Sequence, residues 1–108
     1  LWKYREFAKY DDSGEAKRTG REAMDAFDVA SRDILHEVGA KAVLKAKVKG
    51  AVIGDGRTWD EFRLLHFPSQ AAFSSALEKI GSEMKHRDAA MEDDYLLMVE
   101  TAAVNIAD

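Results

Sequence analysis

Two segments of this chain carry large apolar side chains at even and odd positions alike. They are WDEFRLLHF, residues 59–67, and YLLMVETAAV, residues 95–104. Side chains alternate between the two faces of a strand, so either segment, as a strand, would be apolar on both faces. A sheet that contains such strands needs cover on both sides. This requirement limits the folds that are open to a chain of 108 residues.

Two further segments alternate between apolar and charged residues, as one-sided strands do. They are residues 1–7 and residues 42–50. In the second segment, lysines occupy alternate positions and would share one side of the strand. Lysines in such a row suit an exposed edge of a sheet. We therefore expect residues 42–50 to form an edge strand.

Two segments follow the spacing of amphipathic helices, residues 15–38 and residues 70–80. A glycine directly follows each apolar stripe, and glycine ends helices well. Ser69 stands where the N-cap of the second helix belongs. A short helical piece over residues 83–92 is expected next, with Ser82 as its cap.

The predicted order of elements is β-α-β-β-α-β. This is the α+β ferredoxin-like pattern, an antiparallel sheet with helices on one face. We expect one domain over residues 1–108. The helices cover one face of the sheet, and no further helix remains for the other. An uncovered apolar face predicts an interface, and the simplest cover is a second copy of the same sheet in a two-fold homodimer.

Charge and composition exclude several classes of protein. The chain has 16 basic and 20 acidic residues, a net charge of −4, which argues against a nucleic-acid surface. No apolar run reaches the ~20 residues of a membrane span, and no signal peptide is visible. The absence of cysteine excludes disulfides and thiolate chemistry. We expect a cytoplasmic protein, and, because the chain opens at Leu1 without Met, we expect some residues to precede it.

The stretch GRTWDEFRLLHFPSQAAFSSAL, residues 56–77, and the order of elements resemble the dimeric α+β barrel superfamily. Within it, residues 40–100 are most similar to domain-of-unknown-function family thirteen-thirty. The matching residues are Trp59-Asp60, Phe67-Pro68-Ser69 and Arg87. The resemblance implies a homodimer in which two sheets face each other.

Two positions depart from the pattern of that family. His66 stands where the family has an acidic residue, and Ile80 stands where it has a tyrosine. An activity that depends on either group would not carry over to this chain. The superfamily includes cofactor-free monooxygenases, chlorite dismutase-like haem proteins and muconolactone isomerases, and a shared fold does not fix which function applies.

His66 is the candidate catalytic residue. Its pKa lies near neutrality, so it would serve as an acid or base if it pointed into a cavity between sheet and helices. The alternative is a histidine at a strand end that bonds to a carbonyl or to water. Arg63 alternates with His66 along the strand and therefore faces the other side. We expect Arg63 to be structural, paired with Glu61 or with an acidic group across the dimer.

Three more residues are candidates for substrate binding. Arg87 would hold a carboxylate or phenolate through its fork of donors. The alternative is an ion pair with one of three carboxylates, Asp93, Asp94 or Glu100. Trp59 and Tyr4 would shape a pocket for an aromatic or apolar ligand, although such residues more often fill a core or an interface.

No metal or cofactor is expected. The three histidines, His36, His66 and His86, are widely separated and lack metal-binding spacing. His36 lies on the polar side of its helix, so only His66 or His86 could serve a haem.

Two functions remain. One is a small homodimeric enzyme, monooxygenase- or isomerase-like, that transforms an apolar or aromatic metabolite without a bound cofactor. The other is a non-catalytic binding or stress-type module. A cavity of ~300 Å³ or more, lined by apolar groups with one or two converging polar groups, would favour the enzyme. Solid packing between sheet and helices would favour the module.

Overall fold

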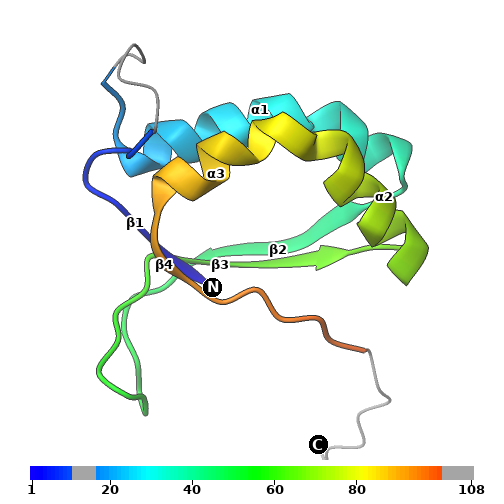
Figure 1. Ribbon diagram of the computed structural model, residues 1–108. Coiled ribbons are helices and arrows are strands. Elements are labelled where there is room, and N and C mark those ends of the chain that lie inside the picture. Colours follow the sequence, from blue (N-terminus) through cyan, green and yellow to red (C-terminus); the bar gives the residue numbers. More distant parts are fainter. Residues whose placement is uncertain (11–16, 101–108) are drawn as a thin grey trace, which may run out of the picture.

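The computed structural model describes residues 1–10 and 17–100. Their elements follow in this order: β1 (Trp2–Tyr4), α1 (Gly20–Glu37), β2 (Lys41–Lys47), β3 (Glu61–His66), α2 (Gln70–Ile80), the 3₁₀ turn η1 (Gly81–Glu83), α3 (Met84–Ala90) and β4 (Met91–Asp94). The strands form one antiparallel sheet in the order β2-β3-β1-β4. All three helices lie on one side of it (Figure 1). This is the predicted ferredoxin-like fold, with β2 at an edge.

The last strand differs from its prediction. It was expected at residues 95–104, but β4 covers Met91–Asp94 and begins inside the expected helical piece 83–92. The helix ends early because the backbone of Met91 is extended and pairs with Tyr4 of β1. Residues 95–100 belong to no named strand, and residues 101–104 lie outside the described part.

The first strand is also shorter than residues 1–7, because the chain after Tyr4 bonds to the helical layer. The Arg5 N–H donates to the Ala90 carbonyl at 2.8 Å, and the Gly20 N–H donates to the Arg5 carbonyl at 3.1 Å. A side chain at Gly20 would clash with the Arg5 carbonyl oxygen, and its Cβ would lie 2.8 Å from the Ala90 oxygen. Glycine is therefore required where these three segments meet.

The helix ends follow the sequence signals. Thr19 caps α1, which begins later than the predicted residue 15, and its hydroxyl accepts the Glu22 N–H at 3.1 Å while Glu22 accepts the Thr19 N–H at 3.0 Å. Ser69 caps α2 as predicted, by accepting the Ala72 N–H at 3.0 Å. Ser82 caps nothing, because the chain continues from α2 into α3 through η1.

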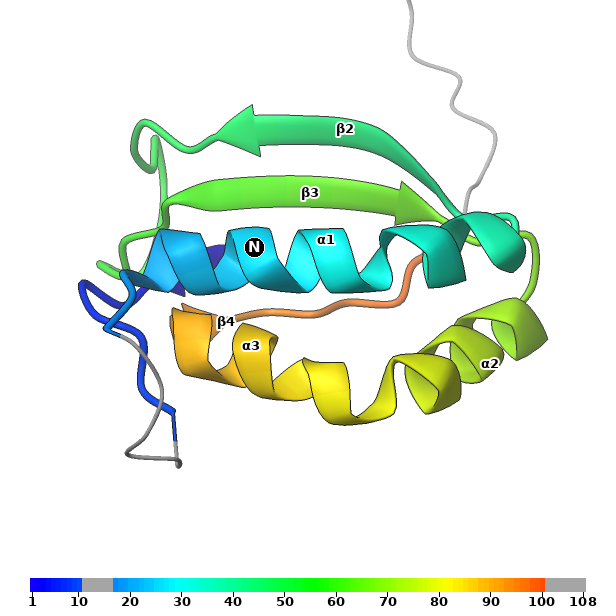
Figure 2. The same cartoon turned by 90° about the horizontal axis from the view of Figure 1, so that it is seen from above.

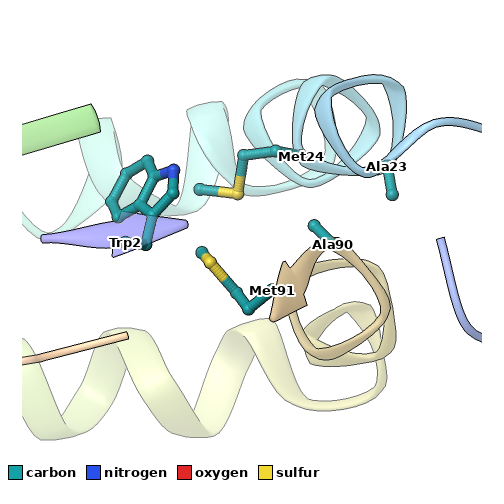
Figure 3. Packing of buried hydrophobic residues seen from close by; sticks show 5 residues of the cluster. All are labelled: Trp2, Ala23, Met24, Ala90 and Met91. Carbon is teal, nitrogen blue, oxygen red and sulfur yellow. The ribbon is translucent and has the colours of Figure 1, made fainter. Parts of the chain in front are cut away.

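The main core lies where β1, α1, α3 and β4 meet. Its buried members are Trp2, Ala23, Met24, Ala90 and Met91. Figure 3 shows the Trp2 ring beside the side chains of Met24 and Met91. The alanines let the backbones of α1 and α3 come close, since they add little bulk between the helices. We call this core, with the Arg63 group described next, the closed end.

Arg63 of β3 points toward the helices and joins them to the sheet. Its guanidinium donates to both Asp28 oxygens of α1 at 2.7 and 2.9 Å and to Glu61 at 2.6 Å. It also lies 4.7 Å from the centre of the Trp2 ring. Burial alone would lower the pKa of Arg63, but the hydrogen bonds and charges of Asp28 and Glu61 raise it above its ordinary value. The predicted Glu61 partner is confirmed, and the bonds to Asp28 agree with the predicted structural role.

The opposite face of the sheet is apolar and uncovered. Since Arg63 faces the helices, Phe62 and Leu64 face away from them. They pair with Ala46 and Leu44 of β2, and the three large side chains are 37–48% exposed. We call these four residues the outer face. The two-sided apolar character predicted for residues 59–67 is thus present in β3.

The far end of the domain is packed less tightly. Leu65 shares the helix-facing side of β3 with Arg63, and Leu77 belongs to the apolar stripe of α2, yet they remain 42% and 41% exposed. Residues 95–100 leave the sheet on the side opposite the helices (Figure 1). We call this region, comprising the second half of β3, α2 and residues 95–100, the open end.

Candidate functional site

A cleft of about 740 Å³ opens where β1 ends, α1 begins and β2 ends. We call it the edge cleft. Its lining residues are Lys3, Tyr4, Arg5, Glu6, Phe7, Thr19, Arg21, Lys47, Val48, Asp60 and Glu92. The volume falls within the range of small-molecule sites. The lining is mostly charged, which differs from the apolar cavity between sheet and helices that would favour the predicted enzyme.

Cations dominate the unpaired groups of the edge cleft. Lys3 is paired with Glu92 at 3.3 Å. Within residues 1–10 and 17–100, no carboxylate forms an ion pair with Arg5, Arg21 or Lys47. The Arg5 Nε atom is buried and has no hydrogen-bond partner among these residues. The lining also holds Glu6, Asp60 and Glu92, so four cations stand beside three carboxylates, and the formal excess of one positive charge suits an anion.

Tyr4 is the predicted site residue that does line the edge cleft. Its N–H donates to an Asp60 carboxylate oxygen at 2.8 Å, and the Arg21 guanidinium lies 5.1 Å from the centre of its ring. Burial raises the pKa of the Tyr4 phenol above its ordinary value, because desolvation disfavours the phenolate. Tyr4 therefore keeps its proton at neutral pH and presents a donor and an aromatic surface.

His66 lies away from the edge cleft. It ends β3 and alternates with Arg63, so it faces away from the helices, on the exposed side of the sheet. The predicted orientation of His66, into a space between sheet and helices, is therefore wrong. Arg63 and His66 both have apolar neighbours on β3, so the sequence did not show which of the two faces the helices. Its catalytic role stays a prediction.

Arg87 is held by an internal carboxylate. Its Nη2 donates to Asp94 of β4 at 3.0 Å, and the Arg87 side chain is mostly buried. This ion pair is the alternative that the sequence offered. Asp94 pairs with Trp2, which pairs with Glu61 at the start of β3, whereas His66 ends that strand. The structure therefore does not bring the predicted acid/base and the predicted anion holder together.

Trp59 belongs to a cluster around Arg57, a residue that sequence reasoning missed. Arg57 forms a bidentate ion pair with Asp93 and donates to the Tyr95 hydroxyl at 2.7 Å. Its guanidinium lies 4.6 Å from the Trp59 ring centre and 4.5 Å from that of Tyr95. This cluster, on the side of the outer face, fastens the β2–β3 loop to the start of residues 95–100. A lone arginine within a glycine-rich turn gave no signal of it.

A second group that the sequence did not reveal contains His86. The Tyr10 hydroxyl and His86 Nδ1 are 2.7 Å apart, and Glu83 lies 3.3 Å from His86 Nε2. Arg18 donates to the same hydroxyl at 3.2 Å. Tyr10 and His86 are 76 positions apart, so no local pattern could join them. The group fastens the segment after β1 to α3.

Within residues 1–10 and 17–100, no three His, Asp or Glu side chains gather as a metal site would require. None of the helices there has the length and apolar character that a membrane crossing requires.

Comparisons with known proteins bear on the fold. No protein-family model matches the sequence, and a search of curated proteins finds no match. The crystal structure of the methylated RPA0582 protein is similar, with a TM-score of 0.88 and 29% identity, over 95% of this chain and 77% of that one. A second structure of RPA0582, a protein of unknown function from Rhodopseudomonas palustris, gives a TM-score of 0.87 and 29% identity over 96% and 79%. These likenesses support the ferredoxin-like fold.

Proposed function

We propose that this protein binds a small organic anion with an apolar or aromatic body in the edge cleft. The observation that carries the proposal is the group of three cations, Arg5, Arg21 and Lys47, that have no carboxylate partner in the described chain. The anionic group of a ligand would pair with these cations, and a planar carboxylate matches the hydrogen-bond donors of an arginine. Tyr4 and the exposed Phe7 offer surface for the rest of the ligand.

Binding is better supported than turnover. Catalysis by proton transfer needs an acid or base within hydrogen-bond reach of the ligand. The predicted acid/base, His66, lies on the other face of the sheet, and Tyr4 keeps its proton at neutral pH. The geometry therefore favours the second of the two functions, a non-catalytic binding module, over a monooxygenase- or isomerase-like enzyme.

The test uses benzoate as the probe and neutral benzamide as its control. We expect benzoate to shift the NMR signals of Tyr4, Arg5 and Arg21, and benzamide to bind more weakly. Arg21→Gln should weaken benzoate binding about tenfold, the worth of one charge-assisted contact. Arg32→Gln, an exposed change on α1 outside the cleft, should leave it unchanged. Shifts that map to another region, or equal binding by both variants, would refute the cleft as the site.

We also propose that the protein is a homodimer with paired outer faces. An open sheet face with several large apolar side chains marks an interface, and a second copy can cover it by two-fold symmetry. The resemblance to family thirteen-thirty and the dimeric α+β barrel superfamily, through Trp59-Asp60 and Phe67-Pro68-Ser69, supports the same assembly. A cytoplasmic location stays an expectation from the sequence.

Light scattering at micromolar concentration tests the assembly. A dimer should give about twice the chain mass of 12.1 kDa. Leu64→Glu should dissociate it, because a charge buried in an apolar interface without a partner costs several kcal/mol. Val29→Glu, at an exposed position of α1, is the matched control and should leave the mass unchanged. A wild-type monomer at all concentrations would contradict the proposal.

A further inference from the structure

Among residues 1–10 and 17–100, no strand lies beside one edge of β3 over most of its length. On the β2 side, β3 is paired from Glu61 to His66. On the β1 side, the described chain gives it a single pair, Trp2 with Glu61. Residues 62–66 therefore present unpaired backbone groups in the middle of the sheet, where natural proteins do not leave them.

On the other side of β1, the pairing with β4 and Tyr95 also ends at Leu1. Leu1 and Tyr95 exchange two backbone hydrogen bonds, of 3.1 and 2.7 Å, next to the pair between Trp2 and Asp94. Beyond this point residues 96–100 bond to no strand in the part of the chain that the structure describes. Figure 2 shows them following the direction of β3, with α1 above the interval between them. Both β3 and β4 run antiparallel to β1, so one strand in line with β1 would fit antiparallel to both.

The side chains around this interval lack packing. Leu65, on the helix side of β3, remains 42% exposed, and Leu77, in the apolar stripe of α2, remains 41% exposed. Residues 96–99 include Leu96, Leu97, Met98 and Val99, and each of these four side chains is 66–72% exposed. Exposed apolar groups on both walls indicate that an apolar strand belongs between them.

We propose that the interval between β3 and residues 96–100 is a strand-acceptor site. Its occupant is an extended apolar segment in line with β1, joined to the backbone ahead of Leu1 and about as long as the unpaired stretch of β3. The segment bonds through its backbone to residues 62–66 on one side and to residues 96–100 on the other, as a strand added to an open edge does. Its helix-facing side is apolar, because Leu65 of β3 lies on that side, and its other side continues the outer face.

Occupancy would also turn residues 95–100 into part of the strand that the sequence predicted at residues 95–104. Continuing the alternation from Asp94, which faces the helices toward Arg87, places Leu96 and Met98 on the helix side. Leu97 and Val99 would then extend the outer face. The inference does not rest on the ligand or on the dimer, since it follows from the pairing of β3 alone.

The test adds six residues of alternating valine and threonine ahead of Leu1, and a Gly-Ser extension of equal length is the control. Valine and threonine favour strands, whereas glycine and serine do not. We expect the Val-Thr extension to slow amide hydrogen exchange in residues 62–66 and 96–99 about tenfold or more and to raise the thermal midpoint. The Gly-Ser extension should do neither.

Three results would overturn the proposal. The Val-Thr extension could give no protection, which means that the interval accepts no strand. The amides could already be protected in the unextended chain in a concentration-dependent way, which assigns the interval to a second copy. Protection that is independent of concentration would mean that residues 95–100 close it themselves. Light scattering on the same samples measures the oligomeric state separately. A failure of the dimer proposal can therefore be told apart from a failure of the strand-acceptor proposal.

Discussion

The closed and open ends of this domain use the same kinds of residue with different results. At the closed end, Trp2, Met24 and Met91 keep 7% or less of their surface exposed. At the open end, Leu65 and Leu77 keep about two fifths. The closed end joins β1, β3 and β4 to α1 and α3, whereas the open end, in the described part of the chain, has no strand between β3 and residues 95–100. Apolar residues make a core only where a neighbouring element meets them.

The largest expected effect comes from Gly20, which has no counterpart at the open end. Gly20→Ala should lower the free energy of unfolding by about 3 kcal/mol or more, because its Cβ would collide with backbone atoms that cannot move independently. Gly50→Ala is the matched control, since a Cβ there meets nothing within 4 Å. Urea denaturation of both variants measures the difference. If Gly20→Ala and Gly50→Ala are equally stable, the backbones around Gly20, Arg5 and Ala90 are packed less closely than the structure shows.

Truncation of one apolar side chain to alanine at each end compares the closed end with the open end. Met24→Ala should cost about 2–3 kcal/mol, the loss for a buried methionine, measured by urea denaturation. Leu77→Ala should cost under about 1 kcal/mol, because much of that side chain already meets solvent. If the Val-Thr extension is added, the cost of Leu77→Ala should rise while that of Met24→Ala stays the same. If Leu77→Ala without the extension lowers the free energy of unfolding as much as Met24→Ala does, the open end is packed as tightly as the closed end.

Two arginines allow a comparison of ion pairs. Arg63→Met should cost about 2 kcal/mol, because it leaves the buried Glu61 carboxylate without its partner. Replacing both, as Arg63→Met with Glu61→Leu, should restore part of the loss. Arg57→Met should change the thermal midpoint less, since the charges around Arg57 are screened by water. Benzoate binding should survive Arg63→Met, and its loss would show that Arg63 also shapes the edge cleft.

The smallest expected effect is a pH dependence at the start of α1. The Thr19 N–H bonds to the Glu22 carboxylate and lowers the pKa of Glu22 below 4.5. The ionised form is favoured in the folded state, so this stabilisation is present above pH 4.5 and is lost as the pH falls through the lower folded pKa. Thermal melts between about pH 3 and 7 should therefore show a weaker pH dependence for Glu22→Gln than for wild type.

An exposed carboxylate at the open end supplies the control for that measurement. Glu78→Gln on α2 removes a charge of the same sign away from the Ser69 and Gly81 caps of that helix, so it controls for general surface charge. If Glu78→Gln flattens the profile as much as Glu22→Gln does, general surface charge rather than the cap is responsible.

Much of the fold could be predicted from sequence because its signals are local. The stripe of α2, its Ser69 cap and its terminal Gly81 are read within a few residues, and the structure confirms all three. The position of β4 could not be read in this way. Met91 leaves the helix because it meets Tyr4, nearly the whole chain away, and no local pattern of AAMEDD encodes that contact.

The roles of Arg63 and His66 were harder to predict, because they depend on which face of β3 the helices cover. Arg63 and His66 both have apolar neighbours on β3. The ion pair with Asp28 on α1 shows that Arg63 is the one that faces the helices. The Glu61 half of the Arg63 group is two residues away and was predicted, whereas Asp28 is 35 positions away and was not. The edge cleft joins residues from β1, α1 and β2, so its excess of cations becomes visible only once these elements are assembled.

The pairing of β1 with β4 has a consequence for the order of folding. Leu1 and Tyr95, which bond to each other, are 94 positions apart, and β1 lies inside the sheet rather than at its edge. During synthesis β1 emerges before β4, and nearly the whole described chain must follow it before its second neighbour exists. Closing so long a loop is entropically costly and slows folding. Until then, α1 and the β2–β3 hairpin are the units that can form, and an unpaired strand edge is exposed to other nascent chains.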